Sequence, residues 1–114
     1  MADTCVFCRI ARGEQAAQIV YQDDTVIAFR DVAPVAPVHI LLVPRQHLAS
    51  VDEGEAHPAL MGQLIVAAAV VARQEGIAAG GYRLVTNVGR NGGQGVFHLH
   101  WHLLGGRRLS WPPG

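Results

Sequence analysis

The order of apolar and polar positions along the chain predicts several short strands and one long helix. Apolar runs typical of strands occupy residues 19–21, 25–29, 38–43, 81–87 and 96–104. The run at 38–43 is almost continuous and stops at Pro44, so it suits a central strand that is covered on both faces. The preceding segment, 31–37, is expected to form a loop, because its two prolines lack the N–H that a ladder needs.

Helical patterns are found at two places. Residues 58–75 begin with a proline in the first turn and carry apolar side chains at helical spacing until Gly76 ends them. Residues 5–12 predict a short helix that ends at Gly13. We find no repeat and no linker. The pattern therefore predicts one α+β domain over residues 1–114, with an antiparallel sheet of about five strands.

Charge and composition narrow the functions that this fold can serve. Nine arginines balance nine acidic residues and lysine is absent, so the chain lacks the broad positive field of a nucleic-acid-binding protein. The longest apolar stretch, 64–72, is too short to span a bilayer, and the first residues do not resemble a secretory signal. Two cysteines give no disulfide framework, so we expect reduced thiols, a cytoplasmic location and no membrane partner.

Three histidines at alternate positions, His98, His100 and His102, carry the main chemical signal. In a strand, residues two apart face the same side, so the three imidazoles are expected on one face. Buried imidazoles need partners, which favours a metal site or a catalytic site over an exposed strand. Neutral histidine is a good nucleophile near pH 7, so attack on phosphorus is chemistry that this run allows.

The loop just before this run, Gly89–Gly95, has four glycines in seven residues. Glycine lets backbone N–H groups approach an anion closely, so the loop is a candidate phosphate nest beside the imidazoles. It lacks the Gly-Lys-Ser/Thr ending of a Walker loop, and it precedes a strand rather than a helix. A plain hairpin turn is the alternative interpretation.

Cys5 and Cys8 form a Cys-x-x-Cys pair near the N-terminus. Three interpretations stay open: a redox pair, two buried thiols, or half of a zinc site. The redox interpretation ranks last, because only four residues precede Cys5 and such pairs normally follow a strand. The metal interpretation needs two more ligands, for which His47 and His98 are candidates, giving a closed structural Cys₂His₂ site.

A resemblance to a known family rests on the Asp31 loop and on four segments, 93–104, 37–44, 81–87 and 105–114. In combination they resemble the histidine triad (HIT) superfamily. The resemblance is greatest to its Hint branch of nucleoside phosphoramidase-like proteins and covers nearly the whole chain. It implies a HIT-like fold and a homodimer in which the long helices and neighbouring strands pair across a twofold axis. Some HIT relatives use the first histidine of the run as a zinc ligand, which adds to the metal interpretation.

The resemblance implies a role for each matching position. His100 would be the nucleophile that forms a nucleotidyl-histidine intermediate, His102 would bond the phosphate or the leaving group, and His39 would support the imidazole cluster. Asp31 would accept the ribose hydroxyls. The α-phosphate would be held by Asn87 and the backbone of Gly93, Gln94, Gly95 and Val96. The purine slot would comprise Val6, Phe7, Ile10, Phe29 and Val32. Trp111 would reach the active site of the partner subunit.

The reaction implied is hydrolysis of a purine nucleoside 5′-phosphoramidate to the monophosphate and an amine, with no cofactor required for catalysis. Hint relatives usually carry serine where this chain has Gly95, so the leaving-group preference stays open. Alternatives are a dinucleoside polyphosphate hydrolase, against which the tail 111–114 argues, a nucleotide-binding scaffolding dimer with weak catalysis, and a zinc-only structural module. His57, Arg107 and Arg108 are expected to be solvated.

Overall fold

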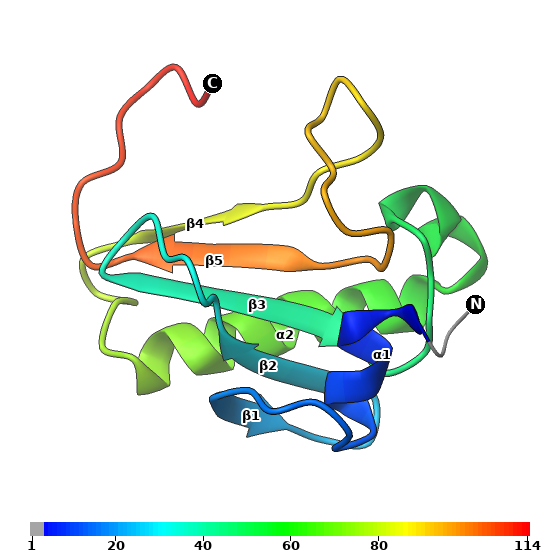
Figure 1. Cartoon of the computed structure of the whole chain (residues 1–114). Helices are drawn as coiled ribbons and strands as arrows, with labels where there is room; N and C mark the ends of the chain where they lie inside the picture. The colour runs from blue at the N-terminus through cyan, green and yellow to red at the C-terminus, as the bar shows by residue number, and fades with distance from the viewer. Residues whose placement is uncertain (1–3) are drawn as a thin grey trace.

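The computed structural model describes residues 4–114, and its centre is a five-stranded antiparallel sheet (Figure 1). The strands lie in the order β1-β2-β3-β5-β4, so the last strand of the chain is inserted between β3 and β4. Every neighbouring pair is antiparallel, which confirms the predicted α+β class and strand count. The strands are β1 Ile19–Gln22, β2 Val26–Arg30, β3 Val38–Pro44, β4 Tyr82–Val85 and β5 Trp101–Gly105.

Helical segments cover both faces of this sheet. They are α1 Val6–Ala11, the 3-10 helix η2 Val51–Ala56, and α2 Pro58–Gln74. α2 crosses one face, and α1 lies against the other face beside β2 and β3 (Figure 1). The sequence pattern did not predict η2, because this acidic segment has no apolar stripe; Ser50 caps it by accepting the Asp52 N–H. Within residues 4–114 we find no helix with the length and apolarity that crossing a membrane requires.

β3 is buried on both faces, as its continuous apolar run predicts. Ile40 and Leu42 pack with α2, whereas Leu41 and Val43 pack with α1. Since successive side chains of a strand point to opposite faces, this one strand contributes to both apolar layers. β3 therefore separates the apolar layer under α2 from the apolar layer under α1.

α2 begins and ends within one residue of the predicted bounds. Pro58 occupies its first turn, where the missing N–H costs no helical bond. The helix buries a stripe at helical spacing: Leu64, Ala67, Ala68, Val71 and Ala72. Gly76 follows the helix end with φ of +76°, a left-handed conformation that favours glycine. Two bonds of 2.9 and 3.0 Å from the Arg30 guanidinium to the Glu75 carboxylate join this helix end to β2.

The last strand is shorter than the sequence pattern predicts. β5 begins at Trp101, so the expectation of a strand from residue 96 is wrong. The β3–β5 register would place Pro44 opposite Leu99 in a longer ladder, and proline has no N–H to donate there. The Leu99 N–H donates instead to the Leu48 carbonyl at 2.7 Å. Of the three histidines of the run, only His102 therefore lies in a strand.

Candidate active site and metal centre

A cavity of about 590 Å³ opens on the α1 face of the sheet. One part of its wall is apolar and includes all five predicted slot residues, Val6, Phe7, Ile10, Phe29 and Val32. Another part is polar and is formed by Asp31, Asn87, His100 and His102 with Gly93, Gly95 and Val96. Sequence reasoning missed Gln15, Ala16, Ala17, Arg30 and Leu41, which also line the cavity. The first three lie in a connecting segment without periodicity, so no pattern marked them.

His100 is a buried residue in the wall of this cavity, and one of its ring nitrogens is fixed. Its Nδ1 lies 2.8 Å from the His98 carbonyl, which can only accept, so Nδ1 carries the proton. Nε2 of the neutral ring therefore carries the lone pair. The Phe7 ring packs edge-on against the imidazole, with 5.3 Å between ring centroids. The residue predicted to be the nucleophile thus has the tautomer that a nucleophile at Nε2 needs.

The backbone around His100 is held by a residue that sequence reasoning missed. β4 ends at Val85 instead of continuing to residue 87, which leaves Thr86 outside the strand. The Thr86 hydroxyl donates to the His100 carbonyl at 2.7 Å. That carbonyl lies just before β5 begins, so the hydroxyl replaces a ladder bond at the point where the strand is interrupted. Only the register of β4 on β5 reveals this contact.

His102 and His39 form a second, connected imidazole pair. The Val35 N–H donates to His39 Nδ1 at 3.1 Å, so the proton of a neutral His39 is on Nε2. His39 Nε2 lies 2.9 Å from His102 Nδ1 and 3.3 Å from Asp31 Oδ2. His102 Nδ1 therefore accepts, and His102 Nε2 carries a proton that it can donate at the cavity wall. His39 lies behind His102 and does not line the cavity.

Burial keeps both rings of this pair neutral near pH 7. Desolvation is the main cause that lowers the pKa of His102 from 6.5 to about 4; the neighbouring His100 and His39 contribute in the same direction, and Asp31 opposes them. Desolvation also lowers the pKa of His39, although the Asp31 carboxylate acts in the opposite direction. A neutral His102 can donate a hydrogen bond from Nε2, but it is not a cationic general acid. The short distances among Asp31, His39 and His102 are those of a hydrogen-bonded chain.

The glycine loop is held in shape by two amide side chains. Gln94 Nε2 donates to the carbonyls of Ala49 and Val96, at 2.7 and 3.1 Å, and its Oε1 accepts the Gly89 N–H. Asn87 Nδ2 donates to the Gly92 carbonyl at 2.6 Å. The Gln94 side chain thus supports the loop and does not line the cavity.

Two backbone donors of the loop are left available beside the cavity. Among the bonds within residues 4–114, the N–H groups of Gly95 and Val96 have no acceptor, and both residues line the cavity. Gly93 has φ of +74°, a conformation that only glycine adopts without strain. The loop therefore offers N–H donors to an anion, as the predicted phosphate nest requires.

Cys5, Cys8, His47 and His98 meet at the N-terminal end of α1, with all four ligand atoms within 4.8 Å of one another. Cys5 Sγ lies 3.3 Å from His98 Nδ1, and Cys8 Sγ lies 3.2 Å from His47 Nδ1. A tetrahedral zinc ion with ordinary Zn–S and Zn–N bonds separates sulfur from nitrogen by about 3.6 Å. The four residues predicted from the sequence therefore form a group with the donor set and the spacing of a metal site.

His98 presents the correct nitrogen to the two sulfurs. Its Nε2 lies 2.8 Å from the Pro44 carbonyl, so Nε2 carries the proton and Nδ1 is a free ligand. Burial lowers the pKa of His98 to about 4, which keeps the ring neutral as a metal ligand must be. The Cys8 N–H donates to Cys5 Sγ at 3.4 Å. His98 thus links the candidate metal-binding group of Cys5, Cys8, His47 and His98 to His100, whose Nδ1 donates to the His98 carbonyl.

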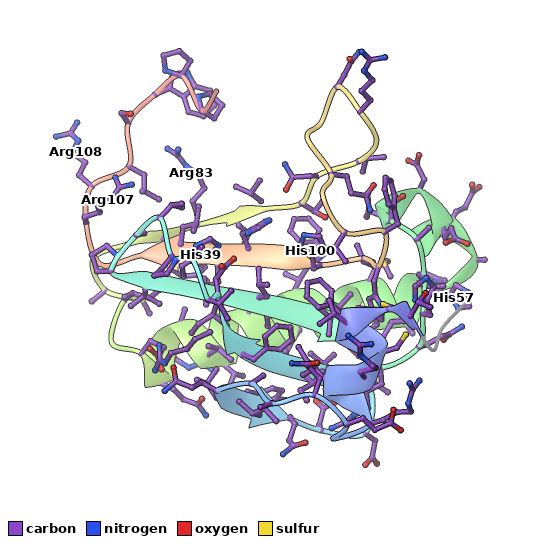
Figure 2. The ribbon with its side chains drawn as sticks, viewed as in Figure 1. His39, His57, Arg83, His100, Arg107 and Arg108 are labelled. Carbon is purple, nitrogen blue, oxygen red and sulfur yellow. The ribbon has the colours of Figure 1, made fainter. Side chains whose placement is uncertain are left out.

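Trp111 does not line the cavity of its own chain. It is 79% exposed, and the Arg83 guanidinium lies 5.9 Å from its ring centroid. Arg83 also donates to the carbonyls of Leu109 and Ser110. Figure 2 shows Arg83 and Arg107 beside the C-terminal tail and away from His100. The role predicted for Trp111 concerns a partner subunit and stays a prediction.

Comparison with known proteins places the chain in a family. The HIT domain model matches residues 12–109. The chain is 51% identical to the purine nucleoside phosphoramidase of Escherichia coli over 96% of this chain and 93% of that protein. It is 46% identical to adenylylsulfatase HINT1 of Arabidopsis thaliana over 96% of this chain and 76% of that protein. The crystal structure of a HIT family hydrolase from Legionella pneumophila superposes with a TM-score of 0.94 at 45% identity, covering 97% of this chain and all of that one. The chain therefore belongs to the HIT domain family, and it is a hydrolase of that family.

Proposed function

We propose that this hydrolase cleaves purine nucleoside 5′-phosphoramidates, releasing the nucleoside monophosphate and an amine. The observation that carries the proposal is the fixed His100 tautomer, with Nδ1–H on the His98 carbonyl and the Nε2 lone pair at the cavity. The name of the Escherichia coli relative supports this substrate class. The slot of Val6, Phe7, Ile10, Phe29 and Val32 suits a purine, and the Asp31 carboxylate suits ribose hydroxyls.

The first chemical step transfers the nucleotidyl group to the protein. His100 Nε2 attacks the α-phosphorus, an N–P bond to the imidazole forms, and the P–N bond to the amine breaks. The amine leaves with one proton taken from solvent. His102 donates from Nε2 to a phosphoryl oxygen, and the N–H groups of Gly95 and Val96 bind the charge that develops there. The His98 carbonyl stabilises the Nδ1–H of the cationic nucleotidyl-imidazole.

The second step releases the nucleotide. Water attacks the same phosphorus, the P–O bond forms, and the P–N bond to His100 Nε2 breaks. The water proton returns to solvent, so the sum is one phosphoramidate plus one water giving monophosphate and amine. No residue has changed its protonation state at the end of the cycle.

We also propose that Cys5, Cys8, His47 and His98 hold a structural zinc ion. Two thiolates and two neutral imidazoles form a closed donor set without a position for substrate. When bound, zinc would supply a cross-link between α1 and the segments that carry His47 and His98. These residues lie outside the wall of the cavity, so the ion has no place in the chemical steps.

We further propose a homodimer, as the HIT resemblance implies. β4 is an edge strand, and Tyr82 at its start is 38% exposed. On α2, Ile65 and Val66 are 41% and 64% exposed, so the long helix has apolar side chains outside the buried stripe. Pairing of these two elements across a twofold axis would cover both, and it would bring each Trp111 near the partner's cavity. Sedimentation or light scattering of the purified protein would measure the mass.

The experiment that tests the catalytic proposal is AMP release from an AMP amide, combined with intact-mass measurement of the quenched protein. The wild type is expected to turn over and to show a transient mass increase of one adenylyl group. His100→Ala should lose both signals, whereas His57→Ala should keep both, because His57 lies outside the cavity. Absence of turnover in the wild type would reject the proposal, and tight AMP binding without turnover would favour a scaffolding dimer. Rates on a diadenosine polyphosphate and on adenylyl sulfate compare the alternative leaving groups.

A further inference from the structure

Arg107, an exposed residue that the sequence suggests is merely solvated, contacts the loop over the His39–His102 pair. Its Nη2 donates to the Val35 carbonyl at 3.0 Å, and its Nη1 donates to the Arg108 carbonyl at 3.0 Å. Each of the two terminal nitrogens thus donates to a backbone oxygen. Arg107 does not line the cavity, so its position does not suit direct contact with a nucleotide there.

Val35 is held at both of its backbone groups. Its carbonyl accepts from Arg107, and its N–H donates to His39 Nδ1 at 3.1 Å. The Val35 side chain is 63% exposed, so apolar burial does not fix this residue. Pro34 and Pro37 in the same loop have no N–H to donate. The two hydrogen bonds of Val35 therefore decide where its N–H points.

The end of β5 places Arg107 against this loop. Gly105 is the last residue of the strand, and Gly106 follows with φ of +89°. A Cβ on Gly106 would lie 2.9 Å from the Pro37 Cβ, so only glycine lets the chain pass this close to the loop. Arg107 comes next, and its side chain reaches the Val35 carbonyl.

We infer that Arg107 is a positioning residue for the proposed reaction, acting through Val35 and His39 on the tautomer of His102. The Arg107 guanidinium anchors Val35, the Val35 N–H holds His39 Nδ1 as an acceptor, and the His39 proton is thereby kept on Nε2. His39 Nε2–H then holds His102 Nδ1 as an acceptor, which leaves the His102 proton on Nε2, where it faces the cavity. The role at the α-phosphate rests on the proposed function, whereas the control of the tautomers does not.

The test compares Arg107→Ala with Arg108→Ala. Both substitutions remove one exposed arginine from the same turn, but only Arg107 donates to Val35. In ligand-free protein with ¹⁵N-labelled histidine, long-range ¹⁵N–¹H spectra distinguish protonated from bare ring nitrogens. We expect wild type and Arg108→Ala to show His39 and His102 protonated at Nε2 alone, and Arg107→Ala to show a mixture of tautomers. On an AMP amide, Arg107→Ala should lower kcat about tenfold, as loss of an outer hydrogen-bonding partner does, with KM changed less than about twofold.

Arg107→Lys supplies the rescue, because a lysine ammonium can donate to the Val35 carbonyl through one bond. It should restore the single tautomer and recover part of kcat, and thermal unfolding of all three variants reports any general loss of folding. Unchanged His39 and His102 tautomers in Arg107→Ala would overturn the inference, whatever happens to the rate. A rise in KM with unchanged tautomers would instead identify Arg107 as a substrate contact. If the wild type releases no AMP, the spectra of the ligand-free protein still decide the tautomer claim separately from the proposed function.

Discussion

Replacing His47 with alanine should reduce both the stability of the protein and its affinity for the purine. His47 is the exposed member of the candidate metal-binding group, and its Nδ1 lies 3.2 Å from Cys8 Sγ. Alanine removes one of four ligands without opening a buried space. His57→Ala is the matched control, because His57 is a histidine outside this group whose side chain makes no capping bond to α2.

The magnitude follows from linkage between zinc binding and folding. If loss of one ligand weakens zinc binding about 100-fold at fixed free zinc, stabilisation by the metal falls by about 2.7 kcal/mol. For a domain of this size that corresponds to a drop in Tm of roughly 10 °C. α1 has only six residues, too few to form a stable helix alone, and it carries Val6, Phe7 and Ile10 of the cavity wall. Loosening α1 should therefore raise KM for an AMP amide several-fold.

The turnover number should change less than KM. His98 keeps its bond from Nε2 to the Pro44 carbonyl when zinc is removed, so the carbonyl that orients His100 stays in place. Zinc content by mass spectrometry, thermal unfolding with and without a chelator, and steady-state kinetics measure the three expectations. Equal zinc content and equal Tm in His47→Ala and His57→Ala would refute the metal reasoning and leave Cys5 and Cys8 as packed thiols.

Three further predictions concern residues around the nucleophile. Thr86→Val should lower kcat about fivefold by removing a bond of about 1 kcal/mol to the His100 carbonyl, whereas Thr86→Ser should keep the rate. Gly95→Ser should fold normally, because a Cβ there meets no heavy atom within 4 Å, and it should change kcat between leaving groups where Gly95→Ala does not. Burial lowers the pKa of His102 to about 4, so the unfolded chain binds more protons than the folded one between pH 6.5 and 4. The free energy of unfolding should therefore fall on acidification through this window. After allowance for solvent screening of a half-buried ring, the fall should be about 1–2 kcal/mol larger in wild type than in His102→Gln. Urea unfolding at several pH values measures the difference.

The sequence predicts much of the fold because its apolar periods agree with the tertiary packing. The continuous run of β3 corresponds to a strand covered on both faces, and α2 is bounded by Pro58 and Gly76 as predicted. The candidate metal ligands could also be predicted, since two cysteines and a few histidines leave a small number of combinations. The 3-10 helix η2 could not be predicted from the sequence, because its acidic residues form a helix through local caps rather than through an apolar stripe.

The residues that position the catalytic groups are harder to predict, because they act through backbone atoms. Val35 contributes its N–H and carbonyl, so its side chain gives no signal of the role. The Thr86 hydroxyl donates to the His100 carbonyl, which lies outside the ladder because β5 begins only at Trp101. Gln94 looks like a ligand residue in the loop but uses its amide to close that loop. Such contacts follow from strand register, which a pattern of apolar residues does not specify.

The interruption of the last strand explains how three alternating histidines come to differ in chemistry. In an unbroken strand the period of two would give His98, His100 and His102 one shared face and similar surroundings. Pro44 ends the ladder instead, and its carbonyl becomes free to bind His98 Nε2. The His98 ring then turns its Nδ1 to the two cysteines, and the His98 carbonyl accepts from His100. Only His102 keeps a strand position, opposite Leu41 of β3 and next to His39. One proline in the neighbouring strand thus separates the candidate metal ligand His98, the proposed nucleophile His100 and the proposed hydrogen-bond donor His102 within five residues.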